Sequence, residues 1–387
     1  MDVRVIGSTK QGYVLPVEDA KIFAGRSAGI CYMKDTFERI EAWDDEKALG
    51  LFDGIGKSGH HSVAGHTSYN LLLTGVPKII AMILNNEKDY NTSEKSARYT
   101  TMATEGDEKR LYGKWFALFY EAIRGQYYEL DDKVIEKLAK ENARYFISVF
   151  TPATTMEYTV DFRQGNYLIQ FLEDYAEKIS ASNDPFNTKL YPWLIKTAEL
   201  FRSVFNCDEI RDKKWRGLSL FAERKRTEYF GEVYSTNYIG SFAQLAQAQR
   251  HRTLNYEMTL PDLVEVSFFV PPILKSTPGL VEQYLKDLNS IKENYPQGMQ
   301  VLINERGTLE DFVLKCTERL CGAAQLEICF QTKATLDKYI SRAVANDETG
   351  ASKLLRPLQG KTKCQFTKQE CTRPCPAGRA SAFTRKI

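Results

Sequence analysis

One succession of predicted elements, a strand, a break and a short helix, occurs twice in this sequence of 387 residues, and it restricts the folds that the chain can adopt. Residues 67–84 read as a strand, a break made by Gly and Pro, and a short helix that the proline opens. Residues 232–249 read in the same way, with Gly240 and Ser241 as the break. Because elements of the same kind follow one another in the same order, the pattern predicts a mixed α+β (α/β) chain built by tandem duplication.

The later parts of the two halves also correspond. An extended segment at 155–162 precedes a helix at 167–177 in the first half. In the second half, an extended segment at 300–304 precedes a helix at 308–331. Each half is therefore expected to be a small mixed sheet packed with long helices.

Residues 182–185, which read Ser-Asn-Asp-Pro, interrupt the chain and place the boundary between the repeats near residues 185–210. The length suits two domains of ordinary size, each with its own core. The sequence therefore predicts three parts, a first repeat at 1–195, a second repeat at 196–350 and a cysteine-containing tail at 351–387.

The composition is typical of a soluble globular protein, with 43% hydrophobic and 26% charged residues. The 52 basic and 50 acidic side chains nearly cancel, which argues against a surface that coats nucleic acid. No apolar run approaches the roughly 18 residues that cross a bilayer, and the first residues lack the apolar core of a signal peptide. We expect a cytoplasmic protein with no nucleic-acid or membrane partner, whose cysteines are thiols or metal ligands.

Three cysteines, Cys364, Cys371 and Cys375, lie close together in the tail. Three thiolates can bind zinc, although their spacing is not that of a standard zinc finger and no fourth ligand is visible. An exposed, loosely ordered tail explains the same residues, so both interpretations stay open. No pair of histidines has the H-E-x-x-H spacing, so the sequence does not indicate a catalytic metal.

Arg250, His251 and Arg252 follow the second short helix and place two fixed cations and an imidazole at its end. Guanidinium groups bind phosphate through paired, charge-assisted hydrogen bonds, so this triplet suits a nucleotide or a cofactor pyrophosphate. A solvated, charged helix end is the plain alternative. Gln247 lies three residues earlier on the same helix face and can hydrogen-bond a base edge.

A second polar cluster lies in the first half. Glu94, Ser96 and Arg98 alternate, so in an extended loop they point to one side, toward one ligand. A carboxylate, a hydroxyl and a guanidinium there can hold a sugar hydroxyl and a phosphate, whereas an ordinary surface loop is the alternative. All four histidines, His60, His61, His66 and His251, fall inside the motif segments of the two halves, which favours function over core packing.

These clusters resemble the two halves of one signature, that of the flavin-dependent (alternative) thymidylate synthases. Residues 94–99, Glu-Lys-Ser-Ala-Arg-Tyr, are similar to its E-x-S-x-R-Y half, and residues 250–252 are similar to its R-H-R half. Residues 59–62 resemble the family's G-H-x-[ST] segment, and residues 143–144 resemble the start of its A-R-x-x-L-P segment. Residues 319–328 resemble its R-x-x-x-x-A-Q-W-E-I segment.

The resemblance implies a role for each matching residue. The expected dUMP-binding residues are Gln247, Arg250, Glu94, Ser96, Arg98 and Arg144. The expected FAD-binding residues are Ser62, Arg250, His251, Arg252, Glu94 and Arg163. Arg319 matches the arginine that favours ionisation of the uracil N3, and it is the expected catalytic residue.

Each half also departs from the family pattern, in complementary places. Where the first half should carry the arginine triplet it has Asn86, Glu87 and Lys88, and it lacks an A-Q-W-E-I segment. The second half has residues 255–258, Asn-Tyr-Glu-Met, after its triplet, and Gln300 where the phosphate arginine belongs. In the family the sites lie between subunits of a homotetramer, so we expect one composite site from two halves and a homodimer that imitates the tetramer.

The activity that the resemblance implies is reductive methylation of dUMP at C5 to dTMP, with FAD, NADPH and 5,10-methylenetetrahydrofolate. The cofactors carry the bond-making chemistry, while the protein orients and polarises the base. One alternative is a related modification at C5, such as hydroxymethylation, or another pyrimidine nucleotide as the substrate. A non-catalytic nucleotide-binding homologue is the other.

Overall fold

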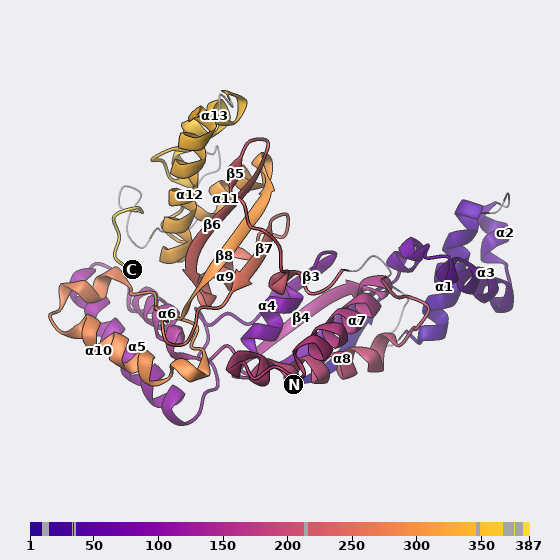
Figure 1. Ribbon diagram of the computed structural model, residues 1–387, viewed down its shortest axis with the longest axis horizontal. Coiled ribbons are helices and arrows are strands. Elements are labelled where there is room, and N and C mark those ends of the chain that lie inside the picture. The colour runs from indigo at the N-terminus through magenta and orange to yellow at the C-terminus, as the bar shows by residue number, and fades with distance from the viewer. Residues whose placement is uncertain are drawn as a thin grey trace. The chain divides into compact units, whose positions relative to one another are not determined.

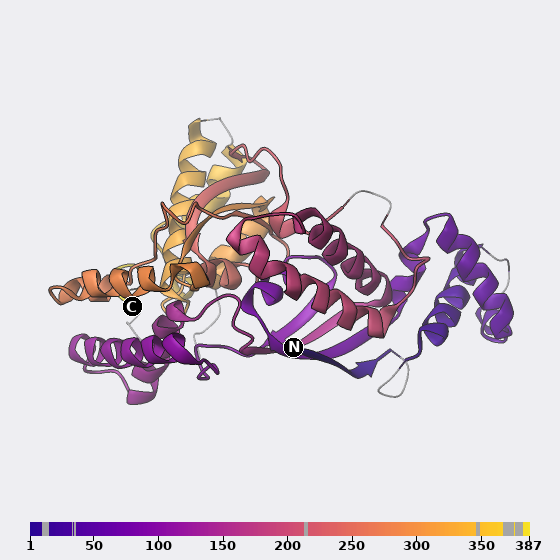
Figure 2. The same ribbon diagram turned by 60° about the horizontal axis from the view of Figure 1, so that its bottom comes forward.

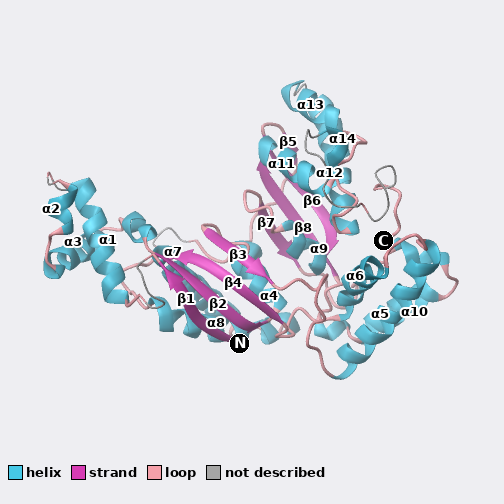
Figure 3. Ribbon diagram, turned by 180° about the vertical axis from the view of Figure 1, so that it is seen from behind, coloured by secondary structure: helices cyan, strands magenta, loops and turns pink. Residues whose placement is uncertain are grey.

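The computed structural model describes residues 1–9, 15–32, 34, 36–212, 216–345, 349–366, 375 and 382–387. These residues form an α+β structure with two antiparallel sheets, so the expected fold class is confirmed (Figures 1 and 3). The described helices include none that is long and apolar enough to cross a membrane.

The chain divides into two compact units, and each is assembled from two stretches of sequence. Unit 1 comprises Met1–Lys95 and Pro152–Ser219, and unit 2 comprises Ser96–Thr151 and Leu220–Ile387. These units do not follow the continuous repeats expected at 1–195 and 196–350, because residues 96–151 of the first half pack within unit 2. A compact unit is not the same thing as a duplicated segment, so the repeat bounds stay a prediction.

The sheet of unit 1 has the strand order β1-β2-β4-β3. Its strands are β1 (Asp2–Ser8), β2 (Ser68–Val76), β3 (Tyr90–Glu94) and β4 (Thr154–Asp161). Its helices are α1 (Val17–Tyr32), α2 (Phe37–Glu41), α3 (Asp45–Lys57), η1 (His61–His66), α4 (Lys78–Leu84), α7 (Phe162–Ile179) and α8 (Pro185–Phe205). Alternate residues of β2 are buried, as its sequence pattern predicts, and α7 packs closely on α8, where Gly165 leaves room for the ring of Phe205.

The sheet of unit 2 has the corresponding order β5-β6-β8-β7. Its strands are β5 (Tyr229–Phe230), β6 (Val233–Ser241), β7 (Asn255–Thr259) and β8 (Gln300–Thr308). Its helices are α5 (Gly106–Gln126), α6 (Asp132–Ala143), η2 (Arg144–Phe146), α9 (Phe242–Ala248), η4 (Pro272–Ser276), α10 (Leu280–Ser290), η5 (Lys292–Asn294), α11 (Leu309–Arg319), α12 (Leu326–Ala345), α13 (Thr349–Leu355), η6 (Arg356–Leu358) and α14 (Lys363–Phe366), and η3 (Ser219–Phe221) spans the change from unit 1 to unit 2.

The two halves of the chain run through equivalent elements in the same order. In the first half β2, α4 and β3 are followed by an insert, then by β4, α7 and α8. In the second half β6, α9 and β7 are followed by an insert, then by β8, α11 and α12. The matching strand orders are what a tandem duplication predicts, and the duplication itself remains a hypothesis.

The ends of the two inserts pair with each other inside unit 2. Ser148 forms an antiparallel bridge with Pro296, and the amide of Gly298 donates to the carbonyl of Tyr145 at 2.9 Å. Gly298 is needed there because an added Cβ would lie 2.9 Å from the Cβ of Tyr145. The helices of the inserts, α5, α6 and α10, lie together at one end of this unit (Figures 1 and 2).

Aromatic side chains hold these inserts together. The indole of Trp115 on α5 stacks on Phe146 at 5.4 Å and meets the ring of Tyr284 on α10 edge-on at 4.9 Å. Its Nε1 donates to Asp287 at 2.8 Å. Buried aromatic contacts of this kind are worth about 0.5–1.5 kcal/mol each beyond the area they bury, so α5 and α10 form one core.

Two expectations about local structure were wrong. The helix expected at 308–331 is two helices, α11 and α12, separated by a loop at 320–325 whose carbonyls bond to arginine side chains instead of continuing a helix. The segment from Glu94 to Arg98 is not one extended loop. Glu94 ends β3, and the chain then turns, with the carbonyl of Ser96 accepting from the amide of Thr100 at 3.1 Å.

Candidate functional site

The structure divides the predicted site residues between the two units. Unit 1 contains Ser62, Glu94 and Arg163. Unit 2 contains Ser96, Arg98, Arg144, Gln247, Arg250, His251, Arg252 and Arg319. Unit 2 therefore holds motif residues from both halves of the sequence.

Arg319, the expected catalytic residue, is held by a histidine. It is the last residue of α11, and its Nε donates to Nε2 of His251 at 2.6 Å. His251 lies in the turn after α9, where burial, together with the nearby Arg319 and Lys315, lowers its pKa to about 2. The imidazole is therefore neutral, and its unprotonated nitrogen can accept the hydrogen bond that fixes the direction of the guanidinium.

Positive charge is concentrated around Arg319. Burial lowers the pKa of its guanidinium below the ordinary value, and the nearby Arg98 and Arg250 lower it further. Tyr256 and Glu318 act on the pKa of Arg319 in the opposite direction, so the repulsion from Arg98 and Arg250 is opposed within the protein.

Arg98 connects the first-half motif to the second-half motif. Its Nε forms an ion pair with Glu141 on α6, and its Nη2 donates to the carbonyl of Ala323 at 3.1 Å. Ala323 lies in the loop that follows Arg319. The hydroxyl of Ser96 accepts from the amide of Arg98 at 3.3 Å and so helps to form the turn.

Arg144 has buried hydrogen-bond donors that are not satisfied. It is only 7% exposed, and its Nε and Nη2 are buried with no hydrogen-bond partner among the described residues. An unsatisfied buried donor costs about 1–3 kcal/mol, more when it is charged, and a bound anion would remove that cost. The guanidinium lies 5.9 Å from the ring centre of Tyr145.

The neighbouring Tyr145 takes part in a buried network to which we assigned no role from the sequence. The carboxylate of Glu327 accepts from the amide of Ser241 at 2.7 Å, from its hydroxyl at 2.6 Å and from the hydroxyl of Tyr145 at 3.3 Å. The side-chain amide of Gln325 donates to the same tyrosine at 3.0 Å. Glu327 and Gln325 belong to the segment at 319–328, so the family-like motif was the signal that could have pointed to the network.

The network makes stability depend on pH through Glu327. Burial raises the pKa of its carboxyl from 4.5 to about 7, although the hydrogen bonds from Ser241 act in the opposite direction. The folded state therefore binds this proton more tightly than the unfolded state does. The resulting stabilisation is fully present below about pH 4.5 and is lost as the pH rises through about 7.

Replacing Glu327→Gln is expected to remove this dependence. Between pH 5 and pH 8 the free energy of unfolding of the unmodified protein should fall by roughly 2–3 kcal/mol more than that of the variant. Urea unfolding at the two pH values measures the difference. Glu310→Gln, at an exposed position, is the matched control and should leave the pH dependence unchanged. Equal pH dependence in all three proteins would mean that Glu327 is ionised in the folded state.

The predicted residues of unit 1 have local partners. The carboxylate of Glu94 pairs with Lys78 at 2.6 Å, and Arg163 pairs with Asp89 at 3.2 Å. Ser62 is exposed in η1, and Gly65 of the same turn lies against the guanidinium of Arg163. Two of the expected FAD-binding residues, Ser62 and Arg163, therefore come from elements that contact each other.

Asn86 and Glu87, which stand where the first half should carry the arginine triplet, hold another part of unit 1. The side-chain amide of Asn86 donates to the hydroxyl of Ser219 at 2.6 Å, and the carboxylate of Glu87 accepts from the amide of Ser219 at 2.8 Å. Burial raises the pKa of Glu87. This position therefore anchors the segment that leads into the second half of the chain.

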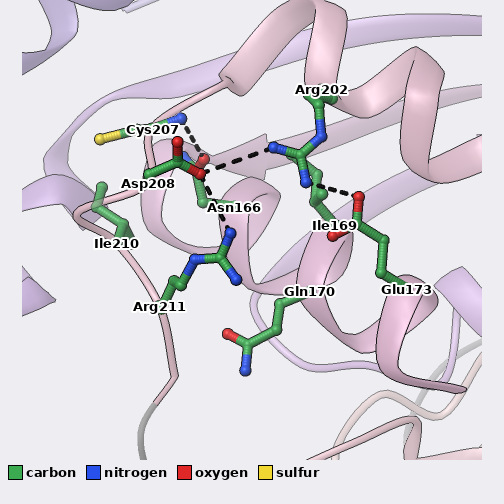
Figure 4. A pocket seen from close by; sticks show the side chains of 9 residues that line it. All are labelled: Asn166, Ile169, Gln170, Glu173, Arg202, Cys207, Asp208, Ile210 and Arg211. Atoms are coloured by element: carbon green, nitrogen blue, oxygen red, sulfur yellow. Dashed lines mark hydrogen bonds and ion pairs between the residues drawn. The ribbon is translucent and has the colours of Figure 1, made fainter. Parts of the chain in front are cut away.

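Two hollows of unit 1 do not contain any predicted site residue. The first, shown in Figure 4, has a volume of about 10 Å³, and Arg202 at its side pairs with Glu173 at 2.6 Å. It holds one water at most. The second, of about 260 Å³, is lined by residues of β1, α1 and their surroundings, among them Leu15, Asp19 and Phe23.

The structure describes only part of the cysteine cluster that was predicted as a possible zinc site. Cys364 and Cys375 are described, whereas Cys371 lies outside the described residues. Among the residues that are described, no three His, Cys, Asp or Glu side chains are grouped as a metal site would require. The zinc interpretation of the tail therefore stays open.

Solved structures similar to this chain are thymidylate synthases and a nucleotide methylase. A flavin-dependent thymidylate synthase ThyX from Helicobacter pylori, complexed with FAD and dUMP, is 19% identical over 53% of this chain and 100% of its own, with a TM-score of 0.29. A second structure of that enzyme, also with FAD and dUMP, is 17% identical over 54% of this chain and 95% of its own, with a TM-score of 0.32. The UMP/dUMP methylase PolB from Streptomyces cacaoi, bound with 5-Br dUMP, is 21% identical over 44% and 76%, with a TM-score of 0.29. TM-scores this low carry no argument about this chain.

The family comparison is more informative. A search among curated proteins gave no match. Residues 17–174 match the family described as thymidylate synthase complementing protein. The matched range includes the segments of the first-half motifs. That family is the one that the motifs of this chain resemble, and the match covers less than half of the chain.

Proposed function

We propose that this protein methylates dUMP at C5 to give dTMP, using FAD, NADPH and 5,10-methylenetetrahydrofolate. One observation carries the proposal more than any other: the hydrogen bond from Arg98 to the carbonyl of Ala323. This hydrogen bond joins the motif at residues 94–99 of the first half to the loop that follows Arg319, the proposed catalytic residue of the second half. Two halves that are each incomplete thus contribute to one constellation within unit 2.

The residues of unit 2 suit a nucleotide monophosphate. The buried, unsatisfied donors of Arg144 suit its phosphate, and Arg250 and Arg319 add positive charge within the same unit. Planar guanidinium groups bind phosphate oxygens in pairs, which fixes the orientation of the nucleotide as well as its position. Gln247 is partly exposed at the end of α9 and is the proposed contact to the base.

Arg319 is the proposed catalytic group. A guanidinium at the edge of uracil stabilises the negative charge that develops as C5 becomes nucleophilic. The neutral His251 keeps the guanidinium in one orientation, so little reorganisation is needed when the charge appears. When bound, FAD supplies a hydride from NADPH and the folate supplies the one-carbon unit, so the protein itself needs no nucleophile.

The proposed flavin contacts are of two kinds. Arg250 and Arg252 are exposed in the turn after α9 and can reach the pyrophosphate. His251 already accepts a hydrogen bond from Arg319. We therefore propose that it contributes to flavin binding only by holding the turn that contains Arg250 and Arg252. Ser62 and Arg163 are the proposed contacts from unit 1.

We also propose that the repeats at 1–195 and 196–350 arose by duplication and that the protein is a homodimer. Matching strand orders in the two sheets support the duplication. If two halves replace two subunits of the family tetramer, two chains complete it. Light scattering of the purified protein tests the dimer.

Mass spectrometry of the product formed from dUMP, FAD, NADPH and methylenetetrahydrofolate tests the activity. The expected product carries one methyl group at C5, and a reaction without the folate is the control. A hydroxymethyl product would replace the proposal with the alternative chemistry. Unchanged dUMP with bound flavin would indicate another pyrimidine nucleotide. Unchanged dUMP with no flavin would favour a non-catalytic nucleotide-binding protein.

A further inference from the structure

The last residues of the chain bond to the loop that follows Arg319. Arg385 is 4% exposed, and its two terminal nitrogens donate to the carbonyls of Gly322, at 2.8 Å, and Ala324, at 2.6 Å. These last residues are held in turn by η4 and by Tyr127, which follows α5. The amide of Ile273 donates to the carbonyl of Lys386 at 3.0 Å. The amide of Lys386 donates to the hydroxyl of Tyr127 at 3.0 Å.

The loop at 320–325 therefore depends on side chains from elsewhere. It separates α11, which ends at Arg319, from α12, which begins at Leu326. Its three successive carbonyls, from Gly322 to Ala324, accept from Arg385, Arg98 and Arg385. One guanidinium thus holds the two outer carbonyls, and the arginine of the first-half motif holds the one between them.

We propose that Arg385 is a positioning residue for the active site. It sets the path of the chain between Arg319 and Gln325, and so it fixes the catalytic guanidinium and the amide that bonds to Tyr145. The proposal rests on the proposed function, because Arg319 is the group whose placement matters. It does not require Arg385 to touch the nucleotide.

The geometry explains why this position needs arginine. A planar guanidinium presents several N–H groups in a fixed fork, so it can bond two carbonyls on either side of one residue. A lysine at the same place has a single ammonium centre and cannot hold both carbonyls in the same geometry. Displacing a catalytic group by about 1 Å can cost about 100-fold in rate.

Two variants and one control test the proposal. Arg385→Met removes the fork and Arg385→Lys keeps the charge, whereas Lys386→Ala changes an exposed neighbour in the same tail and is the matched control. We expect kcat for dUMP to fall about 10- to 100-fold in Arg385→Met, with KM changed less than about threefold, and to fall by an intermediate factor in Arg385→Lys.

Amide hydrogen exchange of the peptide spanning 320–326 gives a second readout that does not depend on turnover. Exchange there should be faster in Arg385→Met than in the unmodified protein and in Lys386→Ala. If the loop exchanges faster but the unmodified protein leaves dUMP unchanged, the proposed function fails and the positioning of the loop stands. If exchange of the loop and kcat are both unchanged, or if melting temperature alone falls, the proposal for Arg385 is overturned while the proposed function is unaffected.

Discussion

Alanine in place of Arg98 or of Arg250 is expected to lower turnover of dUMP by about 1,000-fold or more, although the two residues come from different halves of the chain. Both guanidinium groups lie close enough to Arg319 to lower its pKa, so both belong to the same charged region. Each substitution removes one preplaced cation from the site at which the nucleotide is proposed to bind. The rate of dTMP formation, followed by mass spectrometry, measures the effect.

The two variants differ in their effect on stability, and that difference supplies the control. Arg250 is exposed, so its replacement should leave the melting temperature unchanged. Arg98 pairs with the buried Glu141, and its removal leaves a carboxylate without its cation, at a cost of about 3–5 kcal/mol. The double variant Arg98→Ala, Glu141→Gln should regain stability without regaining turnover. Full activity in any of these variants would disprove a site shared by the two halves.

Replacing Glu305→Gln is expected to destabilise unit 2 by about 3–5 kcal/mol. Glu305 and Lys315 form an ion pair at 2.5 Å with both side chains 0% exposed. The hydroxyls of Tyr234 and Tyr238 donate to the same carboxylate at 2.7 and 2.8 Å. Glutamine keeps an acceptor for these hydroxyls but leaves a buried ammonium without its counter-charge. Urea unfolding measures the loss.

The double variant Glu305→Gln, Lys315→Met should recover most of that stability, because the uncompensated charge is gone. Lys333→Met, which breaks the partly exposed pair with Asp337, is the matched control and should cost less than about 1 kcal/mol. A similar small loss for Glu305→Gln would mean that the ammonium of Lys315 is solvated or neutral.

Much of the fold follows from local patterns. The short helices that become α4 and α9 are preceded by breaks that the sequence marks with Pro77 and Ser241, and Ser241 caps its helix by accepting from the amide of Gln244. The sequence also predicted strands at the places of β2 and β6, and alternate residues of β2 are buried. These features depend on neighbours in sequence, so they can be read from the sequence.

The remaining features depend on partners that are distant in sequence. The break between α11 and α12 is stabilised by Arg98 and Arg385, and nothing in the local pattern at 308–331 reports them. The motif from Glu94 to Arg98 straddles the change from unit 1 to unit 2, so an alternating pattern predicted a shared direction that the turn removes. Arg319 was predicted as catalytic, whereas the partner that orients it, His251, was predicted only as a flavin contact.

The discontinuous units also determine the order in which this chain can fold during synthesis. The indole of Trp115 needs Asp287 and Tyr284, and the bond to Asp287 spans 172 positions along the chain. At ordinary translation speeds of about 5–20 residues per second, α5 waits roughly 10–35 seconds for its partner. During that interval the ring of Trp115 can already stack on Phe146, but the part of the indole that contacts Tyr284 and Asp287 stays uncovered. This stretch of the nascent chain therefore exposes apolar surface until α10 has been synthesised.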